Sequence, residues 1–260
     1  MNNIIIVEGL PCSGKSTTAN YLADKLGFKC FDENSGNNPV DYEFDSFIKG
    51  SELDNFDKEE QLFIRNNSNK KLDGYLINLN NIDKKIFDKL LKYKIYDFLP
   101  WNIESKIMLN KWEEFVNNYD NSKYVFNSVF LQNPMCETMI RFGFDIEVSK
   151  KYISKIYEII KNLNPIVIYL KSDNIKENIE SCLDERGDKW LKMVIDYHCD
   201  GVYGKKNNLN GFNGYIKCLK ERQKREIEIL NDIGIDFIII DNPSNNWDES
   251  YSKIINKIKK

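Results

Sequence analysis

The feature that most constrains the fold is a glycine-rich segment directly after a short apolar run. Residues 4–7 read IIIV, and residues 9–16 read GLPCSGKS. A short β-branched run that ends at a glycine predicts a buried strand. Residues 15–26 carry an apolar stripe at helical spacing, and Gly27 predicts the end of that helix. A strand, a glycine-rich turn and a helix in this order indicate an α/β fold with an anion site at the turn.

The turn matches the Walker A pattern at every fixed position, Gly9, Gly14, Lys15 and Ser16. Its glycines let backbone N–H groups surround an anion, and the helix N-terminus adds partial positive charge. Lys15 is predicted to contact the β- and γ-phosphates of a nucleoside triphosphate, and the Ser16 hydroxyl to bind Mg²⁺. The predicted nucleotide-binding residues are Gly9, Pro11, Cys12, Ser13, Gly14, Lys15, Ser16 and Thr17.

Composition limits the other classes of function. The 260 residues have a net charge of −3, which argues against general affinity for nucleic acids or anionic membranes. No apolar run reaches the roughly 18 residues of a membrane span, and the start of the chain lacks secretory-signal features. The six cysteines are scattered, so we expect a reduced, cytoplasmic protein. The single histidine excludes a multi-histidine metal site. The sequence leaves the oligomeric state open.

The rest of the chain alternates strands and helices, which predicts parallel crossovers. We expect one three-layer α/β domain over residues 1–260 with a five-stranded parallel sheet. Its further strands are predicted at 28–31, 123–126, 165–170 and 236–240, between helices at 105–119, 149–163, 175–184, 215–230 and 251–259. Residues of about 40–100 fit an insertion with a hairpin arm at 73–79 and a helix at 81–93.

Three segments resemble thymidylate-kinase-like small P-loop kinases. VEGLPCSGKSTTA resembles the opening of these enzymes, NIKENIESCLDERGDKW their lid, and YIKCLKERQKREIEILNDIGIDFIIID their long helix and final strand. The resemblance covers residues 1–35 and 120–260. It implies the P-loop NTPase fold, with ATP and Mg²⁺ as cofactors, and places the adenine base near residues 241–245.

The resemblance predicts a lid of about residues 182–214, which includes a loop over 201–214. Arg186 is predicted to close over the transferring group, because guanidinium offers a planar fork for phosphate oxygens. The lid also carries Lys189, Lys205 and Lys206, and glycines that could act as hinges at positions 187, 201, 204, 211 and 214. Beyond the lid, Arg222 or Arg225 could reach the phosphates, but a surface pair with Glu221 or Glu226 is the preferred interpretation.

The acceptor side follows the second and third strands. Asp32 or Glu33 is predicted to orient an acceptor hydroxyl, as an acid does there in several kinases of the resembled group. Asn127 and Ser128 stand where nucleoside-monophosphate kinases usually have Asp-Arg, which counts against a phosphorylated acceptor and leaves a second magnesium contact unassigned. The predicted substrate contacts are Gln132 and Asn133, with Arg141 as a distant substitute for the missing arginine.

These observations predict an ATP-dependent phosphotransferase that acts on a hydroxyl of a small molecule, such as a nucleoside, an antibiotic or another metabolite. A nucleoside-monophosphate kinase of the thymidylate type and a regulatory ATP- or GTP-binding NTPase remain the alternatives. The acceptor, the choice between ATP and GTP, and the role of residues 40–100 stay open.

Overall fold

The computed structural model describes residues 2–32, 36, 38–80 and 82–259. The chain divides into two compact units. The first, which we call the core unit, comprises residues 1–37 and 112–260, and the second, the insert unit, comprises residues 38–111. The predicted insertion falls inside the second.

The core unit is built on a five-stranded sheet in the order β2-β6-β1-β7-β8, and every neighbouring pair in it is parallel. This confirms the predicted α/β fold class and its parallel sheet. In register, Ile4 of the central strand pairs with Tyr124 on one side and Pro165 on the other. The strands are β1 Ile4–Gly9, β2 Lys29–Phe31, β6 Tyr124–Asn127, β7 Pro165–Lys171 and β8 Asp236–Asp241.

Helices connect these strands and extend beyond them. The described helical segments of the core unit are α1 Lys15–Leu26, α6 Gln132–Met135, the π-helical η3 Cys136–Arg141, α7 Ile146–Ile160, η4 Lys161–Leu163, α8 Ile175–Ser181, α9 Leu183–Asp200, α10 Val202–Lys206, α11 Gly211–Ile233, η5 Pro243–Asn245 and α12 Trp247–Ile258. Helix α5, Trp101–Asn117, begins in the insert unit and ends in the core unit.

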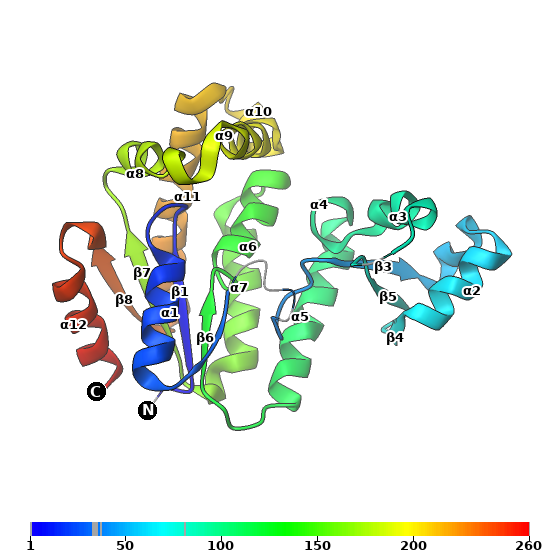
Figure 1. Ribbon diagram of the computed structural model, residues 1–260, viewed down its shortest axis with the longest axis horizontal. Helices are drawn as coiled ribbons and strands as arrows, with labels where there is room; N and C mark the ends of the chain where they lie inside the picture. The colour runs from blue at the N-terminus through cyan, green and yellow to red at the C-terminus, as the bar shows by residue number, and fades with distance from the viewer. Residues whose placement is uncertain (1, 33–35, 37, 81, 260) are drawn as a thin grey trace. The chain divides into compact units, whose positions relative to one another are not determined.

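Alternation along the strands sorts the core onto two faces of the sheet. Ile5 and Val7 share one buried cluster with the apolar faces of α1 and α12. Ile4 and Ile6 point to the opposite face and are equally buried. On that face Tyr169 of β7 reaches α11 with its hydroxyl. The sheet is therefore the middle of three layers, and α8, α9 and α10 lie beyond the carboxyl ends of its strands (Figure 1).

The predicted loop over residues 201–214 is wrong, because α10 and the start of α11 occupy it. Three of the predicted hinge glycines there serve close packing instead. A Cβ at Gly201 would lie 2.5 Å from the Ile140 carbonyl oxygen, and one at Gly204 would lie 2.3 Å from the Cys199 carbonyl oxygen. A Cβ at Gly214 would likewise lie 2.8 Å from the carbonyl carbon of Leu209. Positions 187 and 211 have positive φ and open space, as a conformational role for glycine requires.

The insert unit has its own antiparallel sheet in the order β3-β5-β4. Its strands are β3 Asp45–Lys49, β4 Asn69–Lys71 and β5 Gly74–Asn78, and its helical segments are η1 Gly50–Asn55, α2 Lys58–Asn67, α3 Lys84–Leu90, η2 Leu91–Tyr93 and α4 Ile95–Phe98. The hairpin β4–β5 confirms the predicted hairpin arm. A buried apolar cluster, which includes Ile48, Ile64 and Ile77, joins this sheet to α2 and α3.

Among the described helices, none combines the length and apolar character that crossing a membrane requires.

Candidate active site

The loop that joins β1 to α1 has positive φ angles at three positions. These are 149° at Gly9, 61° at Cys12 and 86° at Gly14. Such residues, alternating with ordinary ones, curl a chain into a concave surface of N–H groups that suits an anion. Gly14 is also the N-cap of α1, so the positive end of the helix dipole meets the same surface.

Close packing fixes the two loop glycines from outside. A Cβ at Gly9 would lie 2.6 Å from the Leu170 carbonyl oxygen, and one at Gly14 would lie 2.4 Å from Cη2 of Trp247. Trp247 stacks on Tyr251, with ring centroids 5.4 Å apart, and Tyr251 stacks on Tyr21 of α1 at 4.0 Å. The indole at the start of α12 therefore abuts the start of α1, and no side chain fits between them.

Lys15 lies inside the loop, not on its surface. Its side chain is 8% exposed, and its Nζ donates a hydrogen bond to the Leu10 carbonyl oxygen at 2.9 Å. A bound phosphate oxygen could replace that carbonyl, since both accept hydrogen bonds from an ammonium group.

Three polar side chains from separate elements meet beside the loop. Ser16 Oγ donates to Asp32 Oδ1 at 3.2 Å, and Asn127 Nδ2 donates to Ser16 Oγ at 3.0 Å and also to Asp32 Oδ1. They come together because β2 and β6 are neighbours and end at the same edge of the sheet. The predicted acceptor acid, Asp32, thus contacts the predicted magnesium ligand. Glu33, its alternative, lies outside the described residues.

A cavity of about 650 Å³ opens at this loop. Residues 11–17 form one wall, so Pro11, Cys12, Ser13 and Thr17 line it together with the glycine, lysine and serine of the motif. The other lining residues used below are Gln132 and Cys136 after β6, Arg186, Trp190, Val194, Tyr197 and His198 of α9, Arg222 of α11, and Pro243, Ser244 and Trp247 after β8. The cavity therefore runs across the loop from the β8 side to the β6 side.

Two loop side chains have surroundings that the motif does not specify: Cys12 is half-buried and Ser13 is buried. Burial raises the pKa of the Cys12 thiol to about 12, and a hydrogen bond with Cys182 adds to this. Ser13 Oγ is buried and has no hydrogen-bond partner among the described residues. The Cys12 thiol therefore contacts Cys182, just before α9, and neither side chain brings positive charge to the loop.

The structure describes residues 182–214 completely, and Arg186 is the one arginine or lysine of that segment that lines the cavity. Its guanidinium lies over the Trp190 ring, 5.5 Å from the centroid, and its side chain is exposed. Lys189, Lys205 and Lys206 are also exposed but do not line the cavity. Arg186 therefore offers planar donors at the cavity wall, and its role in closing over the transferring group stays a prediction.

Arg222 is buried, and the expectation of a surface pair was wrong. Its side chain is 1% exposed, its Nε lies 3.0 Å from Glu226 Oε1, and its Nη2 donates to the Gly9 carbonyl oxygen at 3.3 Å. Tyr169 donates its hydroxyl hydrogen to Glu226 Oε2 at 2.5 Å. The sequence signal was the apolar stripe of α11, because positions 222 and 226 continue the spacing of Tyr215 and the buried residues after it.

Glu8 was also missed as a structural group. Its fully buried carboxylate accepts the backbone N–H groups of Phe130 and Leu131 at 2.8 Å and of Gln132 at 3.2 Å. Burial raises the pKa of Glu8 to about 7, although the N–H groups of Leu131 and Phe130 lower it in part. A charged residue inside an otherwise apolar strand was the available signal. Glu8 ties the strand before the loop to the segment after β6.

The predicted substrate contacts separate in the structure. Gln132 lines the cavity, whereas Asn133 and Arg141 are not among its lining residues. Arg141 pairs with Glu137, one turn away on η3, at 2.6 Å. Of the three, Gln132 is the one placed at the cavity wall.

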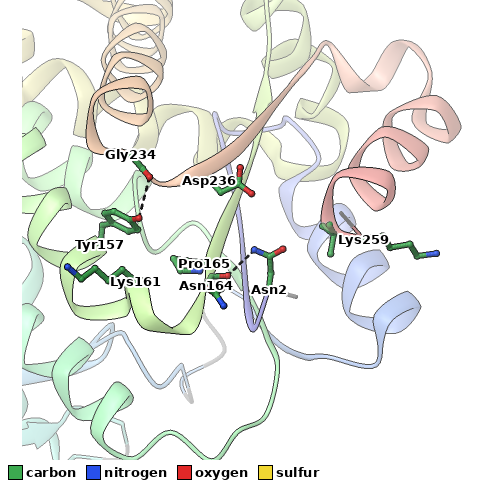
Figure 2. A pocket seen from close by; sticks show the side chains of 9 residues that line it. Asn2, Tyr157, Lys161, Asn164, Pro165, Gly234, Asp236 and Lys259 are labelled. Carbon is green, nitrogen blue, oxygen red and sulfur yellow. Dashed lines mark hydrogen bonds between the residues drawn. The ribbon is translucent and has the colours of Figure 1, made fainter.

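A second hollow of about 490 Å³ lies at the amino ends of β7 and β8 (Figure 2). Asn2 Nδ2 donates to the Asn164 carbonyl oxygen at 2.9 Å there, and the Tyr157 hydroxyl donates to the Gly234 carbonyl oxygen at 3.3 Å. Ligands of open parallel sheets bind at the carboxyl ends of the strands, so we place the active site at the phosphate loop.

No protein-family model matches the chain, and no curated protein matches it. Several solved structures do. The YorR protein from Bacillus subtilis, in complex with phosphorylated GDP, shares 16% identity over 98% of this chain and 95% of its own, with a TM-score of 0.46. The deoxyadenosine kinase from M. mycoides with bound dATP shares 18% identity over 99% of this chain and 100% of its own, with a TM-score of 0.45.

The thymidylate kinase from Candida albicans shares 12% identity over 99% of this chain and 92% of its own, with a TM-score of 0.46. It belongs to the family that the phosphate-loop segment resembles. Because the identities and TM-scores are low, we base the proposed function on the residues of this chain.

Proposed function

We propose that this protein is an ATP- and Mg²⁺-dependent phosphotransferase that transfers the γ-phosphate to a hydroxyl of a small, uncharged molecule. One observation carries the proposal. A concave N–H loop with a buried lysine, a serine whose hydroxyl is bonded to Asp32, and a lid arginine all border the same cavity. Phosphoryl transfer needs little more than such positioning and positive charge.

The triphosphate would lie along the phosphate loop. Lys15 would exchange its bond to the Leu10 carbonyl for the β- and γ-phosphate oxygens. The Arg186 guanidinium would turn from the Trp190 ring toward the transferring group. Pro243 and Ser244, which line the β8 side of the cavity, are where we expect the base.

The polar cluster beside the loop fits Mg²⁺, which prefers oxygen ligands and keeps several waters. The Ser16 hydroxyl would hold the ion, and Asp32, already bonded to that hydroxyl, would add the negative charge. Bound there, Mg²⁺ would neutralise charge on the phosphates during transfer. Asp32 would thereby supply the acidic group for Mg²⁺ that Asn127, an amide, cannot supply.

An uncharged acceptor fits the β6 side of the cavity. The described cations along the cavity are Lys15, Arg186 and Arg222, and Arg222 is held by Glu226. Arg141, the candidate for a second phosphate, is paired with Glu137 away from the cavity. A nucleoside-monophosphate kinase would need a cation on this side, so it is the weaker alternative.

The test measures transfer of labelled γ-phosphate from ATP and from GTP to nucleosides, nucleoside monophosphates, aminoglycosides and sugars. We expect transfer from ATP to an uncharged hydroxyl compound, and Lys15→Ala should abolish it and weaken triphosphate binding. Lys25→Ala, an exposed lysine on the same helix, is the matched control and should behave as wild type.

Tight ATP binding that no acceptor turns into transfer would contradict the proposal and favour a regulatory NTPase. Unchanged ATP affinity in Lys15→Ala would remove its basis.

A further inference from the structure

His198 lies in the last turn of α9 and lines the cavity on its β6 side. The neighbouring Tyr197 hydroxyl donates to the carbonyl oxygen of Cys136, which follows β6, at 3.5 Å. Pro243 and Ser244 follow β8, on the other side of the central strand. His198 is therefore on the side that the proposed function assigns to the acceptor.

The imidazole is fixed in one tautomer by its contacts. Its Nδ1 lies 2.7 Å from the Val194 carbonyl oxygen, which can only accept, so Nδ1 carries the hydrogen. The ring packs edge-on against Tyr215, with centroids 4.7 Å apart. Burial, together with nearby Arg222, lowers the pKa of His198 to about 3, so the ring is neutral. Nε2 therefore presents a lone pair and no hydrogen.

This Nε2 is buried and has no hydrogen-bond partner in the described part of the chain. The His198 side chain is 5% exposed. A buried acceptor without a donor destabilises a fold, and His198 lines the cavity, so a ligand that reaches the ring could supply the missing donor. The Tyr215 hydroxyl, on the ring that packs against His198, is a second buried polar atom without a partner among the described residues.

We propose that His198 is a specificity-determining residue of the acceptor site, whose Nε2 receives a hydrogen bond from a hydroxyl or N–H group of an uncharged acceptor. This inference rests on the proposed function. The inference specifies an acceptor molecule with a hydrogen-bond donor, because the neutral His198 ring offers a lone pair and not a positive charge. The oxygens of a phosphate dianion are acceptors and would face that lone pair without a hydrogen between them.

The chain contains one histidine, which makes this atom directly observable. Protein made with ¹⁵N-histidine and without a histidine tag gives one pair of imidazole nitrogen signals. We expect Nδ1 protonated and Nε2 unprotonated at neutral pH. With a non-hydrolysable ATP analogue and Mg²⁺ present, uncharged nucleosides and sugars should include compounds that shift the Nε2 signal upfield as it accepts a hydrogen bond. Their 5′-monophosphates should not.

Two variants separate recognition from packing. His198→Leu keeps apolar bulk against Tyr215 and should raise the acceptor KM about tenfold, the value of one lost hydrogen bond, with the ATP KM unchanged. His198→Gln keeps an acceptor atom in a similar place and should stay within about threefold of wild type. Thermal unfolding of both variants checks that they fold.

An Nε2 signal that no uncharged compound moves would overturn the inference, as would an acceptor KM in His198→Leu within twofold of wild type. A shift caused by monophosphates alone would also overturn it. Failure of the kinase proposal is a distinct result, because it appears as absent transfer from ATP, whereas the NMR titration reads binding at His198 without turnover.

Discussion

The phosphate loop and the acceptor side of the cavity are built in different ways. The loop is one run of residues whose N–H groups and curvature form the site, with Gly9 and Gly14 setting the curvature. The acceptor side gathers Gln132, His198 and Arg222 from three separate helices. A site made of backbone tolerates almost no change in conformation, whereas a site made of side chains can be altered one group at a time. Changes in the loop should therefore have the largest effects.

Gly14→Ala should break the backbone site. The added Cβ would meet Trp247 at 2.4 Å, and φ of 86° is unfavourable for alanine. We expect kcat/KM for transfer to fall about hundredfold or more, because small displacements misplace the reacting groups, and stability to fall by about 2 kcal/mol. Steady-state kinetics and urea denaturation measure the two effects.

Trp247→Ala in the Gly14→Ala background is the control. Removing the indole should restore part of the lost activity, since the clash is gone and the φ strain remains. If the double variant is no better than Gly14→Ala, the contact with Trp247 does not set the loop.

Arg222→Met tests the acceptor side of the cavity, where side chains from distant parts of the sequence come together. It leaves the Glu226 carboxylate buried without its guanidinium and the Gly9 carbonyl oxygen without a donor. We expect a loss of about 3–5 kcal/mol in the free energy of unfolding, measured by urea denaturation. Adding Glu226→Gln should recover most of it, because the amide is uncharged and still accepts from Tyr169. Equal stability of the single and double variants would contradict the buried pair.

The same contrast explains how far the sequence predicts this structure. The phosphate loop, α1 and the parallel strands follow from short-range patterns, and the structure has them where expected. The composition of residues 201–214, rich in Gly, Lys and Asn, predicts a loop, whereas in the structure Gly201 and Gly204 allow close backbone packing. Such packing depends on partners far along the chain and leaves no local pattern.

The burial of charged residues also depends on partners far along the chain. Arg222 and Arg225 lie three residues apart on one helix, and the buried stripe of α11 includes only position 222. Arg222 is buried and Arg225 half-buried, and the sequence does not state that Arg222 meets the Gly9 carbonyl oxygen, 213 positions earlier in the chain. The contact between Asp32 and Asn127 likewise depends on β2 being next to β6, which the sequence does not state.

Glu8 connects the two regions, and its substitution should give a pH-dependent effect. Its pKa is about 7 in the folded protein against 4.5 without burial, so stabilisation by the protonated form is lost as pH rises between these values. Relative to Glu8→Gln, wild type should lose about 3 kcal/mol of unfolding free energy from about pH 4.5 to 7.5. Urea denaturation of both proteins across this range measures it, and parallel pH profiles would contradict the raised pKa.

Of these substitutions, Asp32→Asn should change activity least. It decides whether Asp32 assists Mg²⁺ or takes a proton from the acceptor. If Asp32 assists Mg²⁺ through Ser16, the Mg²⁺ concentration for half-maximal transfer should rise about tenfold, and excess Mg²⁺ should restore the rate. If Asp32 instead takes the proton of the acceptor hydroxyl, kcat should fall at every Mg²⁺ concentration. The swap Asp32→Asn with Asn127→Asp keeps one carboxylate on Ser16 and moves it to β6. Under the magnesium role the swap recovers the wild-type Mg²⁺ dependence, because the ion needs a carboxylate beside Ser16 and not one particular strand.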